Sequence, residues 1–451
     1  MKKKFSVKIT VWQMLALGYF CVILLGSALL SIPSATANGT TSYINALFTA
    51  TSATCVTGLV PYDTGTHWSV FGQIVILLLI QMGGLGFMTF VSVAANMLGK
   101  KMGLFGSKAL MLSSGGASFV DLRKTISRIV KGTAIFEGAG TVLLSVRFVQ
   151  DFGFGKGVYF ALFHSVSAFC NAGFDLLGSQ YGEFCSLTHY VSDPLVSLTV
   201  CALIIMGGLG FCVWSDVIDT KFRWKKFRLH TKIVLLVNGL LLTSSTLLFW
   251  LFERNTPQVE NYSVATRLMI AFFNATTTRT AGFNVVDFGQ MSGSGYLLSL
   301  MLMFVGGSSA STAGGVKINT LAIIIMGMFA AFRGKNDVEA SKKRIPQALV
   351  SQALAIFVSC LFLVLTSALA ICAIEPPETS TAAIMFEAFS ALGTVGLSMS
   401  ITPTLSVPSK IIVMILMYAG RVGILTIGLA FAEKRTIENI RKPLDDTVII
   451  G

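Results

Sequence analysis

Four short glycine-containing segments recur along the chain at nearly equal intervals. The interval is 115 residues from Gly58 to Gly173, another 109 to Gly282 and another 114 to Gly396. Each glycine follows a weakly apolar stretch of 11–15 residues, and each such stretch lies between two long apolar runs. When a motif and the hydropathy repeat together at one period, a single structural unit is expected to recur. The sequence therefore predicts one unit in four tandem copies.

The long apolar runs approach the length of a membrane-spanning helix. Hydrophobic residues make up 53% of the 451 residues and charged residues only 12%, about half the usual share of charged residues in soluble domains. The short stretches before the glycines would cover only about 16–22 Å as helices, against a hydrocarbon core of about 30 Å. We therefore expect the long runs to span a membrane and the short stretches to enter it and return. The long runs fall at 11–32, 68–98, 127–149, 194–218, 231–252, 295–330, 347–374 and 408–432.

The predicted fold is an all-α integral membrane protein, forming a single membrane domain over residues 1–451. Each unit is a helix, a pore helix, a filter loop and a second helix, and the four units surround a pseudo-fourfold pore. This gives eight transmembrane helices plus four re-entrant helices. The first run is too long for the apolar region of a signal peptide, so it is read as a retained span. The repeats cover 11–99, 127–218, 229–330 and 346–432.

Basic residues concentrate in alternate loops. The N-terminus, the loops 99–131, 219–232 and 331–345, and the C-terminus hold 26 of the 34 Lys and Arg residues. We therefore expect a multi-pass protein of the plasma membrane. The positive-inside rule places these basic segments, and so both termini, on its cytoplasmic side. The net charge of +13 then divides into about +17 inside, +1 within the spans and −5 outside.

Two readings of this charge division stay open on each side of the membrane. The acidic outer side either concentrates cations at a pore mouth or only reflects the scarcity of basic residues there. The basic inner side is ordinary topological bias, a surface for anionic membrane lipid or a docking face for a partner.

Several functional classes are excluded by missing motifs. The eight cysteines contain no CxxC pair, the four histidines no HExxH helix, and the glycine-rich stretches no dinucleotide fingerprint. A membrane enzyme would need His, Asp or Glu residues that converge within the spans. The chain is therefore predicted not to be an enzyme and not to bind nucleic acid. An inverted-repeat secondary transporter does not suit four units of the same sense.

The glycine loops have the chemistry of a cation filter. A dehydrated cation needs a ring of oxygens, which backbone carbonyls supply in conformations open mainly to glycine. A pore helix that enters from outside also ends with its negative dipole end near mid-membrane. The predicted filter loops are Val56-Thr57-Gly58-Leu59, Asn171-Ala172-Gly173-Phe174, Thr280-Ala281-Gly282-Phe283 and Thr394-Val395-Gly396-Leu397.

With this unit, its fourfold recurrence and these loops, the chain resembles the Trk/Ktr/HKT superfamily of cation transporters over essentially its whole length. Its length is similar to that of the Ktr membrane subunit. The resemblance implies potassium uptake, either sodium-dependent or not, with sodium as a second candidate cation. It also implies a homodimer and a cytosolic ring of nucleotide-binding RCK subunits that opens the gate with ATP. Sodium-selective HKT relatives carry serine at the position of Gly58, so the glycine favours potassium. The alternative is a less selective K⁺/Na⁺ channel or a cation symporter of the same superfamily.

A run of small residues interrupts the sixth apolar run and should unwind its helix. A broken helix that lines a cavity is favoured over a phosphate cradle, because GK[ST] is absent. In the resembled family this stretch is an intramembrane loop that obstructs the pore and moves on gating. The predicted gate loop is Gly306-Gly307-Ser308-Ser309-Ala310-Ser311-Thr312-Ala313-Gly314-Gly315.

Arg421 lies roughly 20 Å into its helix, at the depth of this run. An intramembrane arginine is a functional hypothesis by default, and its donors could hold carbonyls that the unwound loop leaves free. The competing reading is an ion pair with Glu137. Lys317, just past the loop, could instead reach toward the cytoplasm.

Arg279 directly precedes the third filter loop and is predicted to support it, with Asp175 and Asp287 as candidate partners. A second motif, Met82-Gly83-Gly84-Leu85-Gly86, recurs as Met206-Gly207-Gly208-Leu209-Gly210. Its simplest reading is a close approach between helices.

Overall fold

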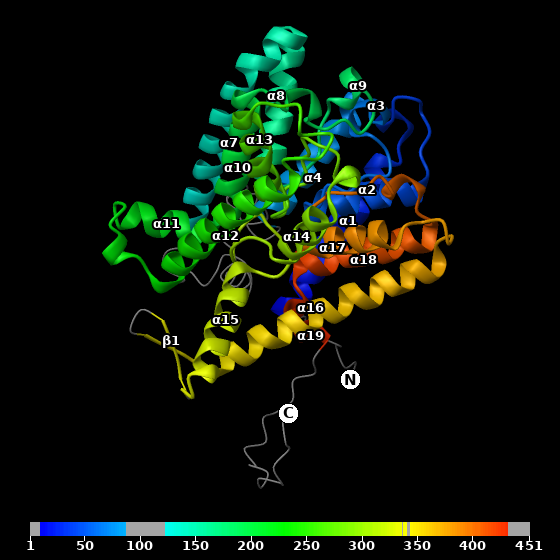
Figure 1. The fold of residues 1–451 in the computed structure, drawn as a ribbon. Helices are drawn as coiled ribbons and strands as arrows, with labels where there is room; N and C mark the ends of the chain where they lie inside the picture. The colour runs from blue at the N-terminus through cyan, green and yellow to red at the C-terminus, as the bar shows by residue number, and fades with distance from the viewer. Residues whose placement is uncertain (1–9, 87–121, 336, 341–342, 432–451) are drawn as a thin grey trace, which may run out of the picture.

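A computed structural model describes residues 10–86, 122–335, 337–340 and 343–431. The chain is mostly helical in this part, and Figure 1 shows long helices on the outside with shorter helices and loops between them. The expected basic segments at the two termini and at 99–121 lie outside the described residues. The loop 219–232 lies within them.

Every predicted unit contains a long helix, a short helix that ends at the glycine loop, and a second helix. The first unit has α1 (Val11–Leu30), η1 (Pro33–Ala35), α2 (Tyr43–Cys55), α3 (Thr64–His67) and α4 (Val70–Leu85). The second has α7 (Leu122–Phe152), α8 (Phe154–Phe169), α9 (Gly178–Tyr181), η3 (Thr188–Tyr190), α10 (Pro194–Leu209), α11 (Phe211–Asp219) and η4 (Trp224–Lys226).

The third and fourth units repeat this order. The third has α12 (Leu229–Glu253), α13 (Val264–Thr277), η5 (Phe288–Gln290), α14 (Gly293–Phe304) and α15 (Ile318–Phe332). The fourth has α16 (Gln347–Ile374), α17 (Thr381–Gly393), η6 (Thr402–Thr404), α18 (Val407–Val422) and α19 (Ile424–Phe431).

Four helices in the described residues are long and apolar enough to cross a membrane, namely α1, α7 (over Ile126–Phe152), α12 and α16. Two bent pairs, α10 with α11 and α18 with α19, raise this number to six if each pair is one span. The run 295–330 is divided between α14 and α15, and the run 68–98 extends beyond the described residues. Large apolar side chains such as Phe362 and Leu369 are 70% and 72% exposed, as expected for lipid-facing surfaces.

The units are joined in a ring. The pore helices α2, α8, α13 and α17 each pack against the second helix of the preceding unit, which is α18, α4, α10 and α14 respectively. Because α18 of the last unit closes on α2 of the first, all four pore helices end around one centre. Figure 1 shows segments far apart in the chain, such as α2 and α18, side by side.

The all-α prediction is wrong in one detail. Two short antiparallel strands, β1 (Val338–Ala340) and β2 (Lys343–Ile345), form a hairpin after α15, with Val338 opposite Ile345. This hairpin lies in a basic loop with no long apolar run, so hydropathy carried no signal for it.

Candidate functional site: four glycine loops and a loop beneath them

The four predicted filter loops share a pattern of positive φ angles. The filter glycine has a positive φ in each loop, from 69° to 96°. The residue two positions earlier also has a positive φ: Val56, Asn171, Thr280 and Thr394. A positive φ is energetically unfavourable for any residue that carries a Cβ. Because such strain recurs at the same position in all four loops, it marks a functional backbone.

The structure brings these loops together as a closed ring. A Cβ built on each glycine would collide with the carbonyl oxygen that precedes the glycine of the next loop. The added Cβ would lie 2.5 Å from the Ala172 oxygen at Gly58 and 2.7 Å from the Ala281 oxygen at Gly173. It would lie 2.6 Å from the Val395 oxygen at Gly282, and at Gly396 it would collide with the Thr57 oxygen, which closes the ring. Each loop therefore presents backbone oxygen to its neighbour at a point where no side chain fits.

Hydroxyl groups of the pore helices fix these loops, which the sequence reasoning missed. Ser52 Oγ accepts from the Gly58 amide and Ser390 Oγ from the Gly396 amide, both at 3.0 Å. Ser167 Oγ accepts from the Phe174 amide at 3.0 Å. Thr277 Oγ1 donates to the Phe283 carbonyl at 2.5 Å. The signal was present, because Ser52, Ser167 and Ser390 all stand six residues before their filter glycine.

A cavity of about 470 Å³ opens on the side of the ring that the charge pattern predicts to face outward, and all four filter glycines line it. Asp175, Glu183 and Asp287 also line this vestibule, and no Lys or Arg of the described residues does. Of the two readings of the acidic outer side, this geometry favours cation attraction. Burial and the neighbouring Asp63 carboxylate raise the pKa of Asp175 to about 7.

Other acidic residues assigned to the outer side do not act as free surface charges. Glu387 is 1% exposed. It accepts hydrogen bonds from two hydroxyls that follow the fourth loop, Ser398 Oγ at 2.7 Å and Thr402 Oγ1 at 2.5 Å. Asp63 is 4% exposed and caps α3. The outer charge of −5 therefore overstates what an approaching ion meets.

The predicted gate loop lies beneath the ring. Its backbone bonds to the break between α10 and α11, with the Ser308 amide donating to the Gly208 carbonyl at 3.0 Å. A Cβ on Gly314 would collide with Thr394, and one on Gly306 would lie 3.2 Å from Thr280 Cγ2. The loop is thus packed directly against the third and fourth filter loops.

Arg421 links this loop to the end of α4. Its guanidinium donates to the Thr312 carbonyl in the loop and to the carbonyls of Gly83 and Gly84 at the end of α4. The competing ion pair with Glu137 is not among its contacts in the described residues. Glu137 instead accepts from Gln81 Nε2 at 3.2 Å. Lys317 donates to the Ala313 carbonyl at 2.5 Å, so it contacts the loop rather than reaching away from it.

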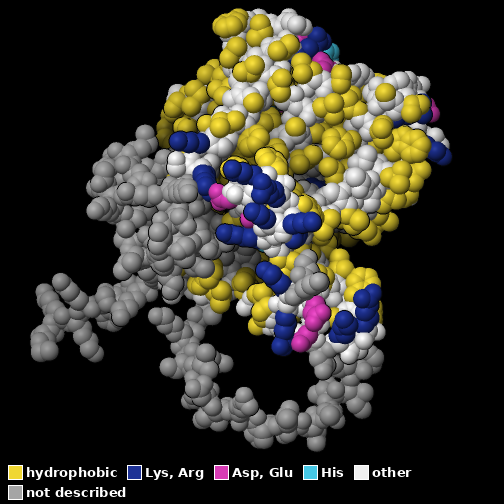
Figure 2. All heavy atoms as spheres, turned by 90° about the vertical axis from the view of Figure 1, so that its left-hand side faces the viewer, with side chains coloured by type: hydrophobic (Ala, Val, Ile, Leu, Met, Phe, Trp, Pro, Cys, Tyr) yellow, Lys and Arg dark blue, Asp and Glu magenta, His cyan; other side chains and the backbone are white. Residues whose placement is uncertain are grey.

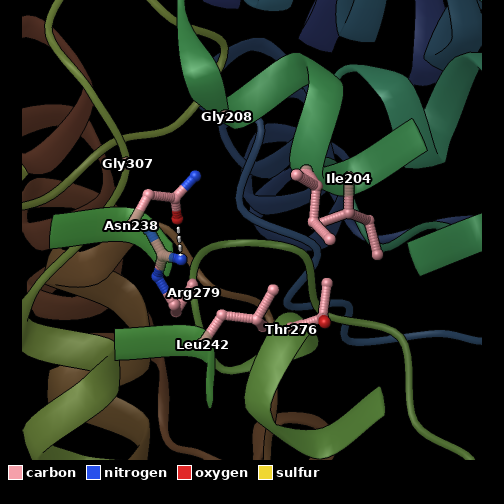
Figure 3. Close-up of a pocket in the computed structure, with 8 residues that line it drawn as sticks. Ile204, Gly208, Asn238, Leu242, Thr276, Arg279 and Gly307 are labelled. Carbon is pink, nitrogen blue, oxygen red and sulfur yellow. Dashed lines mark hydrogen bonds between the residues drawn. The ribbon is translucent and has the colours of Figure 1, made fainter. Parts of the chain in front are cut away.

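Arg279 has a different partner from those expected. Its guanidinium donates to Asn238 Oδ1 on α12, not to Asp175 or Asp287. Figure 3 shows the two side chains pointing toward each other beside Gly307 of the gate loop. The side chain is directed behind the filter, away from the vestibule, so the outer carboxylates are out of reach.

The second glycine motif makes close helix contacts, as its simplest reading states. A Cβ on Gly83, on Gly207 or on Gly420, which holds the corresponding place in the fourth unit, would collide with the carbonyl of Thr54, Phe169 or Leu392, respectively. Each of these carbonyls lies four residues before a filter glycine. The absent side chains let the second helices pack against the ends of the pore helices.

The ring of loops, the acidic vestibule and the apolar exterior define an integral membrane protein of the cation-transport class. The chain belongs to the TrkH family, whose model, described as a cation transport protein, matches residues 19–440.

The chain is similar to named relatives over its full length. It is 40% identical to the "Potassium/sodium uptake protein NtpJ" of Enterococcus hirae, over 100% of this chain and 99% of that protein. It is also 40% identical to the "Ktr system potassium uptake protein B" of Bacillus subtilis, over 99% and 98%. The crystal structure of the potassium transporter TrkH from Vibrio parahaemolyticus matches the fold with a TM-score of 0.72 at 17% identity, covering 96% of this chain and 87% of that one.

Proposed function

We propose that this chain takes up potassium across the plasma membrane through a filter of backbone carbonyls from its four glycine loops. The observation that carries the proposal is the ring itself, in which each filter glycine faces a carbonyl oxygen of the next loop. The C-terminal ends of four pore helices point at this ring, and their dipoles favour a cation there. In full, the proposed architecture has eight transmembrane and four re-entrant helices, with both termini in the cytoplasm.

The gate in this proposal is the loop Gly306–Gly315 with Arg421. The loop lies below the ring and is bonded to α10, α11 and Arg421, so its displacement would open the path. Control by a cytosolic nucleotide-binding ring and assembly as a homodimer follow from the family resemblance. The Bacillus relative is named as part of a Ktr system, which is consistent with a separate partner. The proposal assigns no catalytic activity.

A second candidate function is less selective transport of potassium and sodium. It is favoured by the filter sequences, whose other three residues differ between loops, and by the potassium/sodium name of the Enterococcus relative. The four glycines repeat around the ring, but the side chains beside them differ in size from loop to loop.

The experiment is cation uptake by purified protein in liposomes under an imposed potassium gradient, with and without sodium. Channel-like uptake follows the membrane potential alone, whereas a strict symporter needs its co-ion. The proposal expects potassium uptake in both conditions. If no potassium, sodium or rubidium enters, with or without a regulatory partner, the proposal fails.

A further inference from the structure

The turn between α11 and α12 combines exposed basic and aromatic side chains. Every residue from Lys221 to Lys226 is exposed. Phe222 is 79% exposed and Trp224 46% exposed, and they alternate with the basic residues. Figure 2, which faces the side on which α11 lies in Figure 1, shows a group of Lys and Arg side chains next to hydrophobic ones. We call residues 221–226 the basic turn.

The acidic residues around the basic turn are already engaged. Asp219 pairs with Arg128 at 2.7 Å. Asp216 pairs with Arg228 at 3.7 Å and accepts from its backbone amide at 2.9 Å. Among the described residues, no ion pair involves the four cations of the turn, Lys221, Arg223, Lys225 and Lys226. The turn therefore presents four cations without a counter-charge within the described chain.

The turn has a defined shape. Lys221 and Phe222 have φ values of 51° and 59°, and their amides donate to the Ile218 and Val217 carbonyls at 3.2 Å and 3.1 Å. The Phe227 ring lies 5.6 Å from the Trp224 ring and is itself buried. The Lys226 backbone amide donates back to the Arg223 carbonyl at 2.9 Å. The exposed cations and rings are thus held on an ordered backbone.

The basic turn is at the level where the chain enters the membrane. The apolar span α12 begins at Leu229, three residues after the turn ends. On its other side, α11 is bent by 88° from α10, so it runs across the spanning direction. α11 also packs against α7 and α12. An exposed Phe and Trp at this level match the aromatic belt of membrane interfaces.

We propose that the basic turn binds the headgroups of anionic phospholipids, with Phe222 and Trp224 inserted among the lipids. The four cations complement headgroup phosphates, and clusters of Lys and Arg beside a span are attracted to anionic leaflets. The exposed rings favour a lipid surface over an acidic soluble partner, because an apolar ring gains by leaving water for the interface. The turn then fixes the tilt of α11, whose Phe211 amide donates to the Ala310 carbonyl of the gate loop, and the start of α12.

The test measures tryptophan quenching by brominated lipids in full-length protein in nanodiscs. The chain has five tryptophans, so the signal of Trp224 is the difference between the unmodified protein and Trp224→Phe. We expect brominated phosphatidylglycerol to quench Trp224 at about a tenfold lower mole fraction than brominated phosphatidylcholine, the size expected for one to two effective charges. The variant Lys225→Gln/Lys226→Gln should lose most of this preference.

Matched variants separate a lipid site from general positive charge. Arg333→Gln/Lys335→Gln removes two exposed cations from the end of α15 and should keep the preference. Phe154, as exposed as Phe222 at 79%, provides the aromatic control: Phe154→Ala should leave Trp224 quenching unchanged, and Phe222→Ala should reduce it.

Three outcomes overturn the proposal: equal quenching by both lipids, equal loss in the two glutamine pairs, or no quenching of Trp224. In that case the docking-face reading of the basic inner side would be the one left open. Because quenching is read without ion flux, this result and the transport result succeed or fail separately.

Discussion

At the scale of single residues, the filter depends on positions where a Cβ has no room and on hydroxyls that hold the backbone. Gly396 has a φ of 92° and faces the Thr57 carbonyl. The glycines were predictable from the sequence because their spacing repeats. The partners of Arg279 and Arg421 were not, because Asn238 and Gly83 lie 41 and 338 residues away and only packing brings them near.

Gly396→Ala should abolish most potassium flux, because the added Cβ collides with the Thr57 carbonyl oxygen. The matched control is Gly334→Ala after the end of α15, where φ is 63° but nothing lies within 4 Å of the added Cβ. Both variants carry the cost of about 1 kcal/mol for a left-handed residue with a Cβ. Flux into liposomes should therefore fall only in the first, and equal flux in the two would contradict the ring.

Ser390→Ala should lower selectivity for potassium over sodium about fivefold, because it removes a hydrogen bond worth about 1 kcal/mol from the Gly396 amide. Ser390→Thr keeps the hydroxyl and should restore selectivity. Thr366→Ala is the control, since its hydroxyl bonds only within α16 and is exposed. The measurement is the potassium/sodium permeability ratio; an unaltered ratio in Ser390→Ala would show that the hydroxyl is dispensable.

Potassium uptake should weaken as outer pH falls from 8 to 6. Asp175 has a pKa of about 7, so it is ionised above this pH and loses its charge below it. A unit charge about 10 Å from the ion at a dielectric constant of about 50 contributes about 0.7 kcal/mol, or roughly threefold in half-saturating potassium. Asp175→Asn should remove this pH step, and Asp287→Asn should keep it. If the pH dependence of uptake survives in Asp175→Asn, a group other than Asp175 causes it.

At the scale of elements, the positions of the four pore helices and the break in the third unit followed from length and hydropathy. The division of two predicted spans into bent pairs did not follow from them. α10 is bent by 88° against α11 at Gly210, and α18 by 91° against α19 at Gly423. A continuous apolar run looks the same whether its helix is straight or bent. The β1–β2 hairpin was missed for the related reason that a polar loop carries no clear period.

Arg421→Ala should raise potassium flux in the absence of a regulatory partner and weaken the partner's effect. The substitution frees the Thr312, Gly83 and Gly84 carbonyls and removes a positive charge beneath the filter. Arg421→Lys keeps the charge but not the planar set of donors, so its effect should be intermediate. Lys317→Gln, which releases only the Ala313 carbonyl, should change flux less. Unchanged flux and unchanged control in Arg421→Ala would contradict its role in the gate.

At the scale of the whole molecule, the ring is closed by the contact of α2 with α18, between the first and last units. The sequence predicted four similar units, but their cyclic order came from packing between helices. The ring has four glycine positions in one conformation and unequal residues around them, which is why the potassium/sodium permeability ratio is the informative quantity.

The central claim is that four carbonyl loops select potassium. The most direct measurement is the permeability of purified protein in planar bilayers to potassium, rubidium and sodium, each tested alone. We expect similar values for potassium and rubidium and a smaller value for sodium, because a ring of carbonyls replaces the hydration shell of the larger ions. Equal permeability to sodium and potassium, or conduction of none of the three both with and without a regulatory partner, would contradict the claim.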